Sequence, residues 1–176
     1  TGKCGTDIRL AQLTGTPAWV QDTKFGQSVV TFSSSVTATV ASSRALILGQ
    51  RQTVMIWFKP AKADKKKHTR LVGKGDHINR NYNIWHRAGQ LACQIYGTRG
   101  KAQVIKNYKS NVGEWTHVAC VNDGNKYRMY INGVEVASRS SRHLGVPRTS
   151  SADPLTIGAA LQFSNGKRYA HKQFEG

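Results

Sequence analysis

Acidic residues are scarce in this sequence. Its 176 residues include 9 Asp plus Glu against 26 Lys plus Arg, which gives a formal net charge of +17. Enzymes that hydrolyse glycosidic bonds need two carboxyl groups about 5–10 Å apart. We therefore expect no catalytic residues, and a protein that is not an enzyme, because the acidic residues stand singly along the chain: Asp7, Asp22, Asp64, Asp76, Asp123, Asp153, Glu114, Glu135 and Glu175.

Long apolar runs are also absent. No run approaches the roughly 18 residues that a membrane-spanning helix needs, so we expect no membrane insertion. The excess of positive charge instead predicts an anionic partner. Nucleic acid, acidic polysaccharide and a lipid surface all fit this charge.

Cysteine is rare as well, with three residues at positions 4, 93 and 120. Their spacings match no zinc pattern such as C-x2-C, so we expect no metal ligands. One disulfide with one thiol left over is the simplest oxidised arrangement. Three buried thiols in a reducing compartment is the alternative.

Alternating side chains dominate what the sequence does contain. The stretch from Gly113 to Ser138 reads GEWTHVACVNDGNKYRMYINGVEVAS. Asp123-Gly124 marks one tight turn, and Asn132-Gly133 supplies the positive φ angles that a two-residue hairpin turn prefers. The stretch therefore predicts a meander of three antiparallel strands.

The same period recurs in five other segments: QSVVTFSS near Gln27, QTVMIWFKP from Gln52, RLVGKG from Arg70, YNIWHRAGQLACQIYG from Tyr82 and PLTIGAAL from Pro154. They are rich in Val, Ile, Thr and aromatic residues, and Gly, Asn or Pro bounds them. Many short strands at regular spacing predict an all-β fold, an antiparallel β-sandwich or jelly roll. Three basic segments, 59–70, 138–153 and 164–173, are expected to be loops at its ends.

The stretch GEWTHVACVNDGNKYRMYINGVEVA resembles the signature of the laminin-G-like, concanavalin A-like jelly rolls, a group that includes the pentraxins. TVMIWFKP resembles that family's strand with a core Trp, here Trp57, and LTIGAA and FEG resemble its late strand and the Phe-x-Gly that follows. The resemblance implies a concanavalin A-like jelly roll over residues 25–176, with residues 1–24 as an N-terminal extension or edge segment.

A disulfide between Cys93 and Cys120 also follows from the resemblance, because pentraxin-like domains bridge comparable strands. We expect both cysteines on strands of the same sheet region, with Cα atoms about 4.4–6.8 Å apart. Cys4 is then left unbridged or pairs with another chain.

Calcium is the common cofactor of the family that the sequence resembles. The one local oxygen-rich patch contains Asp76, Asn79, Asn81 and Asn83, with Arg80 inside it. Calcium sites in this family usually use more than one carboxylate, so we expect no cofactor, with calcium at this patch as the alternative.

With its basic loops, the sequence resembles those laminin-G-like domains that bind sulfated or carboxylated glycans through Lys and Arg on rim loops. We therefore expect a non-catalytic binding module for anionic polymers, chiefly acidic or sulfated glycans, in an extracellular or secreted protein. Arg offers a planar fork that matches sulfate and carboxylate, and Lys adds a mobile charge. The candidate anion-binding residues are Lys65, Lys66, Lys67, Arg70, Lys74, Arg139, Arg142, Arg148, Lys167, Arg168 and Lys172.

The alternative is a structural or coat protein of a virion, filament or ribonucleoprotein particle. Such a protein would bind nucleic acid through the same basic surface, and Tyr82, Trp85 and Tyr108 could stack on bases. Packing within the sheet is the favoured role of Tyr82 and Trp85.

An open sheet edge is the last expectation. In the family, a strand of the type Ile-Asp-x-Val normally follows Phe-x-Gly, whereas here the sequence stops at Gly176. Unpaired buried backbone groups cost about 1–3 kcal/mol each. We therefore expect the stretch Thr1 to Val20, or a segment of a partner chain in a homo-oligomer or filament, to cover that edge.

Overall fold

The computed structural model describes residues 12–14, 18–33, 36–62, 68–75, 81–148, 153–164, 167–171 and 174–176. Of residues 12–14, 161–164 and 167–171 it describes the backbone alone. Statements below about the structure refer to these parts of the chain.

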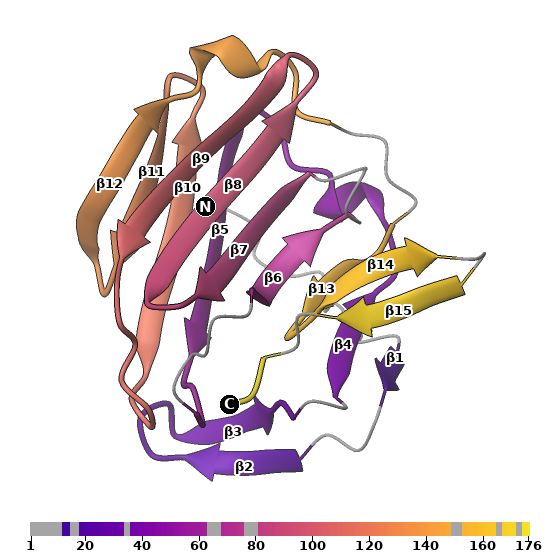
Figure 1. Ribbon diagram of the computed structural model, residues 1–176, viewed down its shortest axis with the longest axis vertical. Coiled ribbons are helices and arrows are strands. Elements are labelled where there is room, and N and C mark those ends of the chain that lie inside the picture. Colours follow the sequence, from indigo (N-terminus) through magenta and orange to yellow (C-terminus); the bar gives the residue numbers. More distant parts are fainter. Residues whose placement is uncertain are drawn as a thin grey trace.

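Two antiparallel sheets face each other and form a β-sandwich (Figure 1). One sheet has the order β1 (Gln12–Thr14), β4 (Thr37–Val40), β13 (Leu155–Ile157), β6 (Thr69–Lys74), β7 (Tyr82–Arg87), β8 (Gln90–Gly97) and β9 (Gly100–Asn107). The other has the order β12 (Val134–Ser140), β11 (Lys126–Ile131), β10 (Thr116–Asp123) and β5 (Arg51–Phe58). The predicted all-β sandwich is confirmed.

Two hairpins and two short 3₁₀ turns complete the described chain. The hairpins are β2 (Ala18–Asp22) with β3 (Gln27–Thr31), and β14 (Ala160–Ser164) with β15 (Lys167–His171). The turns are η1 (Arg44–Leu46) and η2 (Arg142–Leu144). The domain boundary expected after Lys24 falls in the turn between β2 and β3, which pair from Asp22↔Gln27 onward.

The predicted meander is formed by β10, β11 and β12. Asn132 and Gly133 have φ angles of 49° and 85° and close the β11–β12 turn. In the β10–β11 turn, the Asp123 carboxylate accepts the backbone N–H groups of Asn125 at 2.8 Å and Lys126 at 2.7 Å. Both turns therefore lie where the sequence placed them.

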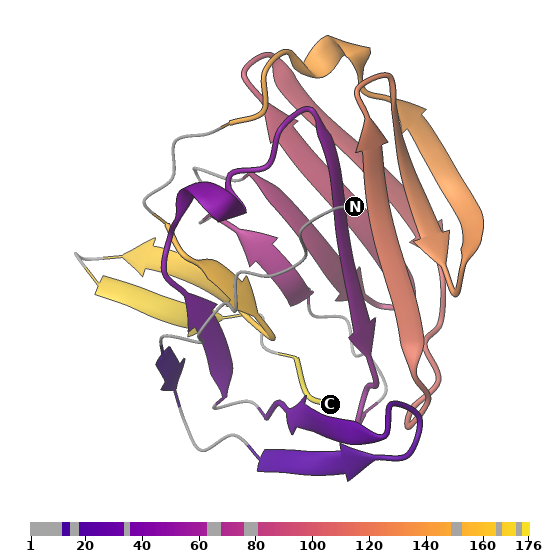
Figure 2. The same cartoon turned by 180° about the vertical axis from the view of Figure 1, so that it is seen from behind.

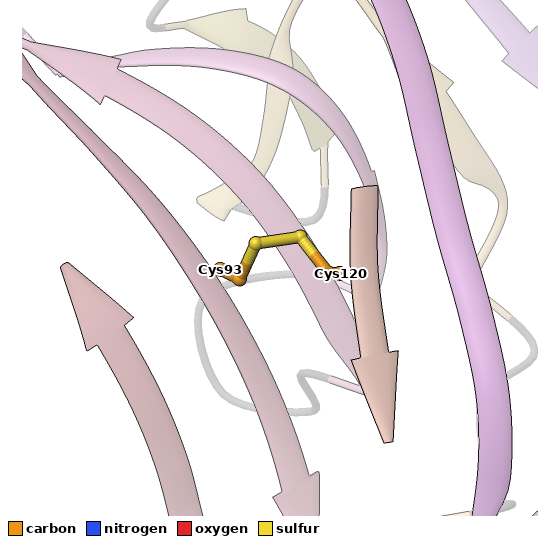
Figure 3. The surroundings of a disulfide bond; sticks show 2 residues. All are labelled: Cys93 and Cys120. Carbon is orange, nitrogen blue, oxygen red and sulfur yellow. A yellow bond between two sulfur atoms is a disulfide. The ribbon is translucent and has the colours of Figure 1, made fainter. Parts of the chain in front are cut away.

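The predicted disulfide between Cys93 and Cys120 is present, with Cα atoms 5.9 Å apart. Cys93 lies on β8 and Cys120 on β10, so the bond joins the two sheets across the core (Figure 3). The expectation that both lie in the same sheet region was wrong. Each cysteine points inward from its own sheet, at 0% and 1% exposure, and the two side chains meet between the layers.

Trp57 is not the core residue that the sequence analysis assigned to β5. Its side chain is 41% exposed, whereas Phe58 is 3% exposed and belongs to the core. Successive side chains of a strand point to opposite faces. Because Phe58 and Ile56 face the core, Trp57 and Met55 face outward.

The edges of the two sheets differ. Gln12–Thr14, within the stretch proposed as a cover, pairs with β4 at the edge of the larger sheet. The backbones of Phe32 and Gly176 exchange hydrogen bonds of 2.7 and 3.0 Å. The smaller sheet has one edge at β5, which pairs with β10 and with no other described strand. Cover of the β5 edge by a partner segment stays a prediction.

Candidate functional site

Basic residues of the segment 138–153 come together at one end of the sandwich, which we call the η2 end. Helix η2 lies at the top of Figure 1, beside the turn that joins β8 to β9. Arg142 and Arg148, two of the candidate anion-binding residues, are exposed here. Arg139 is exposed too, but it lies in strand β12 rather than in a loop.

Backbone contacts hold the η2 segment against the β8–β9 turn. Arg99 N donates to Leu144 O at 3.0 Å, and Thr98 N donates to Val146 O at 2.8 Å. Gly97 lies against the same segment, and a Cβ atom at that position would overlap the carbonyl oxygen of Leu144. Glycine at position 97 is therefore a condition for the close approach.

Four further cations, which are not among the candidates predicted from the sequence, reach the η2 end. Arg51 pairs with Asp123 in register across β5 and β10, and Lys126 begins β11. Arg99 and Lys101 flank the start of β9. With the three predicted residues, the exposed cations of the η2 end are Arg51, Arg99, Lys101, Lys126, Arg139, Arg142 and Arg148.

Asp123 is the acidic residue nearest to these cations in the strand register. Its pKa is lowered, first by the backbone N–H of Lys126 and then by the Arg128 guanidinium, whose Nη1 lies 2.5 Å from Oδ2. Arg128 Nε is also 3.6 Å from Glu135 Oε2. Arg128 therefore balances the charge of Asp123 without using any of the seven cations.

The same arrangement offers no general acid at Asp123. A glycosidase needs one carboxyl group whose pKa is raised so that it can protonate the leaving group. The pKa of Asp123 is shifted in the opposite direction, and Arg128 contacts both Asp123 and Glu135.

Arg70 and Lys74 lie away from any rim. Both are in strand β6, at 7% and 1% exposure. Arg70 Nη1 donates to Gly75 O at 3.0 Å, and Lys74 Nζ donates to Asp153 O at 2.7 Å and Ser42 Oγ at 2.9 Å. Burial lowers the pKa of Lys74. The basic pattern could not distinguish these internal partners from an external anion.

For the remaining candidate anion-binding residues, no side chain is described. Lys65, Lys66, Lys67 and Lys172 are outside the described residues, and Lys167 and Arg168 belong to β15, where the backbone alone is described. The segment 164–173, expected to be a loop, is thus partly a strand.

The oxygen-rich patch is partly described. Asp76, Asn79 and Arg80 lie outside the described residues, and Asn81 and Asn83 are buried at 6% and 3% exposure. Within the described ranges, no group of three or more His, Cys, Asp or Glu side chains is placed to hold a metal ion. The helices described there are too short to cross a membrane.

Solved structures of similar fold include binding domains of toxins and a domain of an extracellular enzyme. The binding domain of botulinum neurotoxin serotype G matches with a TM-score of 0.66 and 10% identity over 93% of this chain. The binding domain of paraclostridial mosquitocidal protein 1 matches with 0.68 and 18% over 93%. The chain spans 40% and 41% of these two toxin chains.

Domain 4 of an extracellular arabinanase from Geobacillus stearothermophilus, solved with arabinotriose, matches with a TM-score of 0.67 and 20% identity. That match covers 96% of this chain and 74% of the other. No curated protein matches the chain. At these identities the matches show the fold. The family model described as the concanavalin A-like lectin/glucanases superfamily matches residues 31–171, and the chain belongs to this superfamily.

Proposed function

We propose that this domain is a non-catalytic module of an extracellular or secreted protein that binds glycans carrying carboxylate or sulfate groups. The observation that carries the proposal is the convergence of seven exposed cations at the η2 end, while Asp123 is paired with Arg128. Guanidinium groups match carboxylate and sulfate with two parallel hydrogen bonds. Five of the seven cations are arginines.

The shape of the η2 end favours a polymer over a small molecule. The recess between Asn122, Ser141 and Tyr96 has a volume of about 20 Å³, which is room for a water molecule. A ligand therefore lies across the surface and contacts several cations in succession. A linear polyanion does this, and release of its counterions adds to its affinity.

Two observations favour a glycan over nucleic acid. Of the three aromatic residues considered for base stacking, Tyr82 and Trp85 are buried at 4% and 8% exposure, and Tyr108 is partly buried and packs against the core. Structures of this fold were solved with arabinotriose and, in the botulinum neurotoxin D domain, with N-acetylneuraminic acid.

The Cys93–Cys120 disulfide fits an oxidising, extracellular setting.

The anion-binding surface of the proposal keeps six residues for which no side chain is described: Lys65, Lys66, Lys67, Lys167, Arg168 and Lys172. It omits Arg70 and Lys74, whose cationic groups are turned to carbonyl oxygens inside the protein.

Charge removal at the η2 end tests the proposal. The variant Arg99→Gln/Lys101→Gln/Arg142→Gln should bind a heparin-derived octasaccharide at least about tenfold more weakly than the wild type. The slope of log affinity against log salt should fall by about two to three units, one per lost contact.

The matched control removes the same charge elsewhere. Arg44, Lys106 and Lys109 are exposed and lie outside the η2 end, and Arg44→Gln/Lys106→Gln/Lys109→Gln should keep most of the affinity. Equal losses in both variants would mean that net charge alone drives binding, and would contradict a site at the η2 end.

A further inference from the structure

A cluster of aromatic rings lies at the opposite end of β5, beside the β2–β3 hairpin. The hairpin is at the bottom of Figure 1 and of Figure 2, away from η2. Trp57 on β5 and His117 on β10 are register partners, with ring centroids 4.8 Å apart and an angle of 38° between the rings. Beside them, Met55 is 66% exposed. Clustered apolar surface of this kind marks binding sites.

The hairpin turn holds these rings in place. Phe25 lies edge-on to Trp57 at 5.4 Å and to Trp115 at 5.0 Å. Asp22 accepts hydrogen bonds from Trp115 Nε1 at 2.9 Å and from the backbone of Lys24 at 2.9 Å. A site whose rings are fixed before binding loses less entropy when a ligand arrives.

Two ammonium groups stand over the rings, and they differ in their partners. Lys59 Nζ is 5.3 Å from the centre of Trp115 and forms a 3.2 Å ion pair with Asp22. Lys24 Nζ is 4.5 Å from the centre of Trp57, and within the described residues no carboxylate lies at ion-pair distance from it. Lys24 can therefore pair with an incoming anion next to an exposed aromatic ring.

We propose that Lys24, Trp57 and His117 form a subsite for one sugar residue that carries a carboxylate. This rests on the proposed function for its ligand class and adds a second place of contact. One face of a pyranose carries weakly positive C–H groups that pack on the negative face of an aromatic ring. The Lys24 ammonium group moves off the face of the Trp57 ring and pairs with the carboxylate of the sugar.

The subsite lies on the same strand as Arg51, a cation of the η2 end. Trp57 and Arg51 are six positions apart on β5, or about 20 Å at 3.3 Å per residue. One polymer can thus contact the subsite and the η2 end together, which raises affinity through effective concentration.

A monosaccharide separates the subsite from the η2 end, because it contacts one site at a time. Methyl β-D-glucuronide, titrated into the 176-residue chain, should shift the indole NMR signal of Trp57, and methyl β-D-glucoside should bind at least about fivefold more weakly. Lys24→Gln should remove this preference, and Trp57→Ala should weaken glucuronide binding about tenfold.

Trp19→Ala is the matched control, since Trp19 is 58% exposed on the neighbouring strand β2. It should bind like the wild type. Unchanged glucuronide binding in Trp57→Ala and Lys24→Gln would overturn the subsite even where the η2 variant has lost the octasaccharide. Tighter binding of thymidine 5′-monophosphate than of the glucuronide would overturn it in favour of a nucleotide. Equal losses of octasaccharide affinity in the η2 variant and its charge-matched control, with an intact Trp57 response, would instead count against the η2 end.

Discussion

Cys93 and Cys120 join strand β8, which lies next to the edge strand β9 of one sheet, to β10 of the other, 27 residues apart in sequence. Both are buried within the core cluster. The bond therefore closes a loop that holds the two layers together, rather than fastening a surface segment.

Removal of this bond should destabilise the domain without abolishing the fold of each sheet. For a loop of this length, Cys93→Ala/Cys120→Ala should lower the free energy of unfolding by about 3.5 kcal/mol. Urea unfolding of the wild type with and without reductant, beside the variant, measures this. A variant as stable as the oxidised wild type would contradict a structural role for the bond.

Phe58 and Trp57 should respond very differently to truncation, although they are neighbours in β5. Phe58 is in the core, so Phe58→Ala should cost about 3–5 kcal/mol of unfolding free energy. Trp57→Ala on the outer face should cost less than about 2 kcal/mol. Thermal and urea unfolding measure both, and the reverse order would show that the faces of β5 are assigned wrongly.

Gly97→Ala should weaken anion binding without removing a charge. The added Cβ overlaps the carbonyl oxygen of Leu144 and displaces η2 from the β8–β9 turn. Octasaccharide affinity should fall at least about threefold, which is less than the fall in the triple-charge variant. Gly49→Ala is the control, because a Cβ there meets no atom within 4 Å. Equal affinities of the two variants would show that the position of η2 does not matter.

Alkaline pH should destabilise the protein through its buried tyrosines. Burial raises the pKa of Tyr82 to about 12 and also raises the pKa of Tyr127, whereas an unfolded Tyr has a pKa of about 10. The unfolded chain then releases protons first, so stability is full below pH 10 and falls between about pH 10 and 12. Tyr82→Phe should make this fall shallower in urea titrations at pH 9, 10 and 11. An unchanged fall would contradict the role of Tyr82.

The sequence predicted those parts of the fold that depend on local chemistry. Asn132-Gly133 needs positive φ angles, and alternation around it fixes three strands. Alternation did not reveal which face of β5 is buried, because Val54, Ile56 and Phe58 on one side and Met55 and Trp57 on the other are all apolar. The strand β9 was missed, although Ala102 and Val104 alternate with the polar Lys101 and Gln103 at its start.

The candidate site was predicted less completely than the fold. The cations of the η2 end come from distant parts of the sequence. The register of β5, β10 and β11 brings Arg51 and Lys126 to this end. The docking of η2 on the β8–β9 turn adds Arg99 and Arg142. A basic pattern also cannot show that Lys74 donates to Asp153 O inside the protein. Tertiary contacts, rather than composition, decide which cations remain available.

The most direct test of the central claim is a titration of the 176-residue chain with three polymers of equal length at physiological salt: a sulfated or uronic-acid glycan, a neutral glycan and single-stranded DNA. The account predicts that the acidic glycan binds at least about tenfold more tightly than DNA of the same charge density, and that the neutral glycan binds most weakly. Equal binding of the acidic glycan and DNA, with the same steep salt dependence, would contradict it and support a nucleic-acid coat instead.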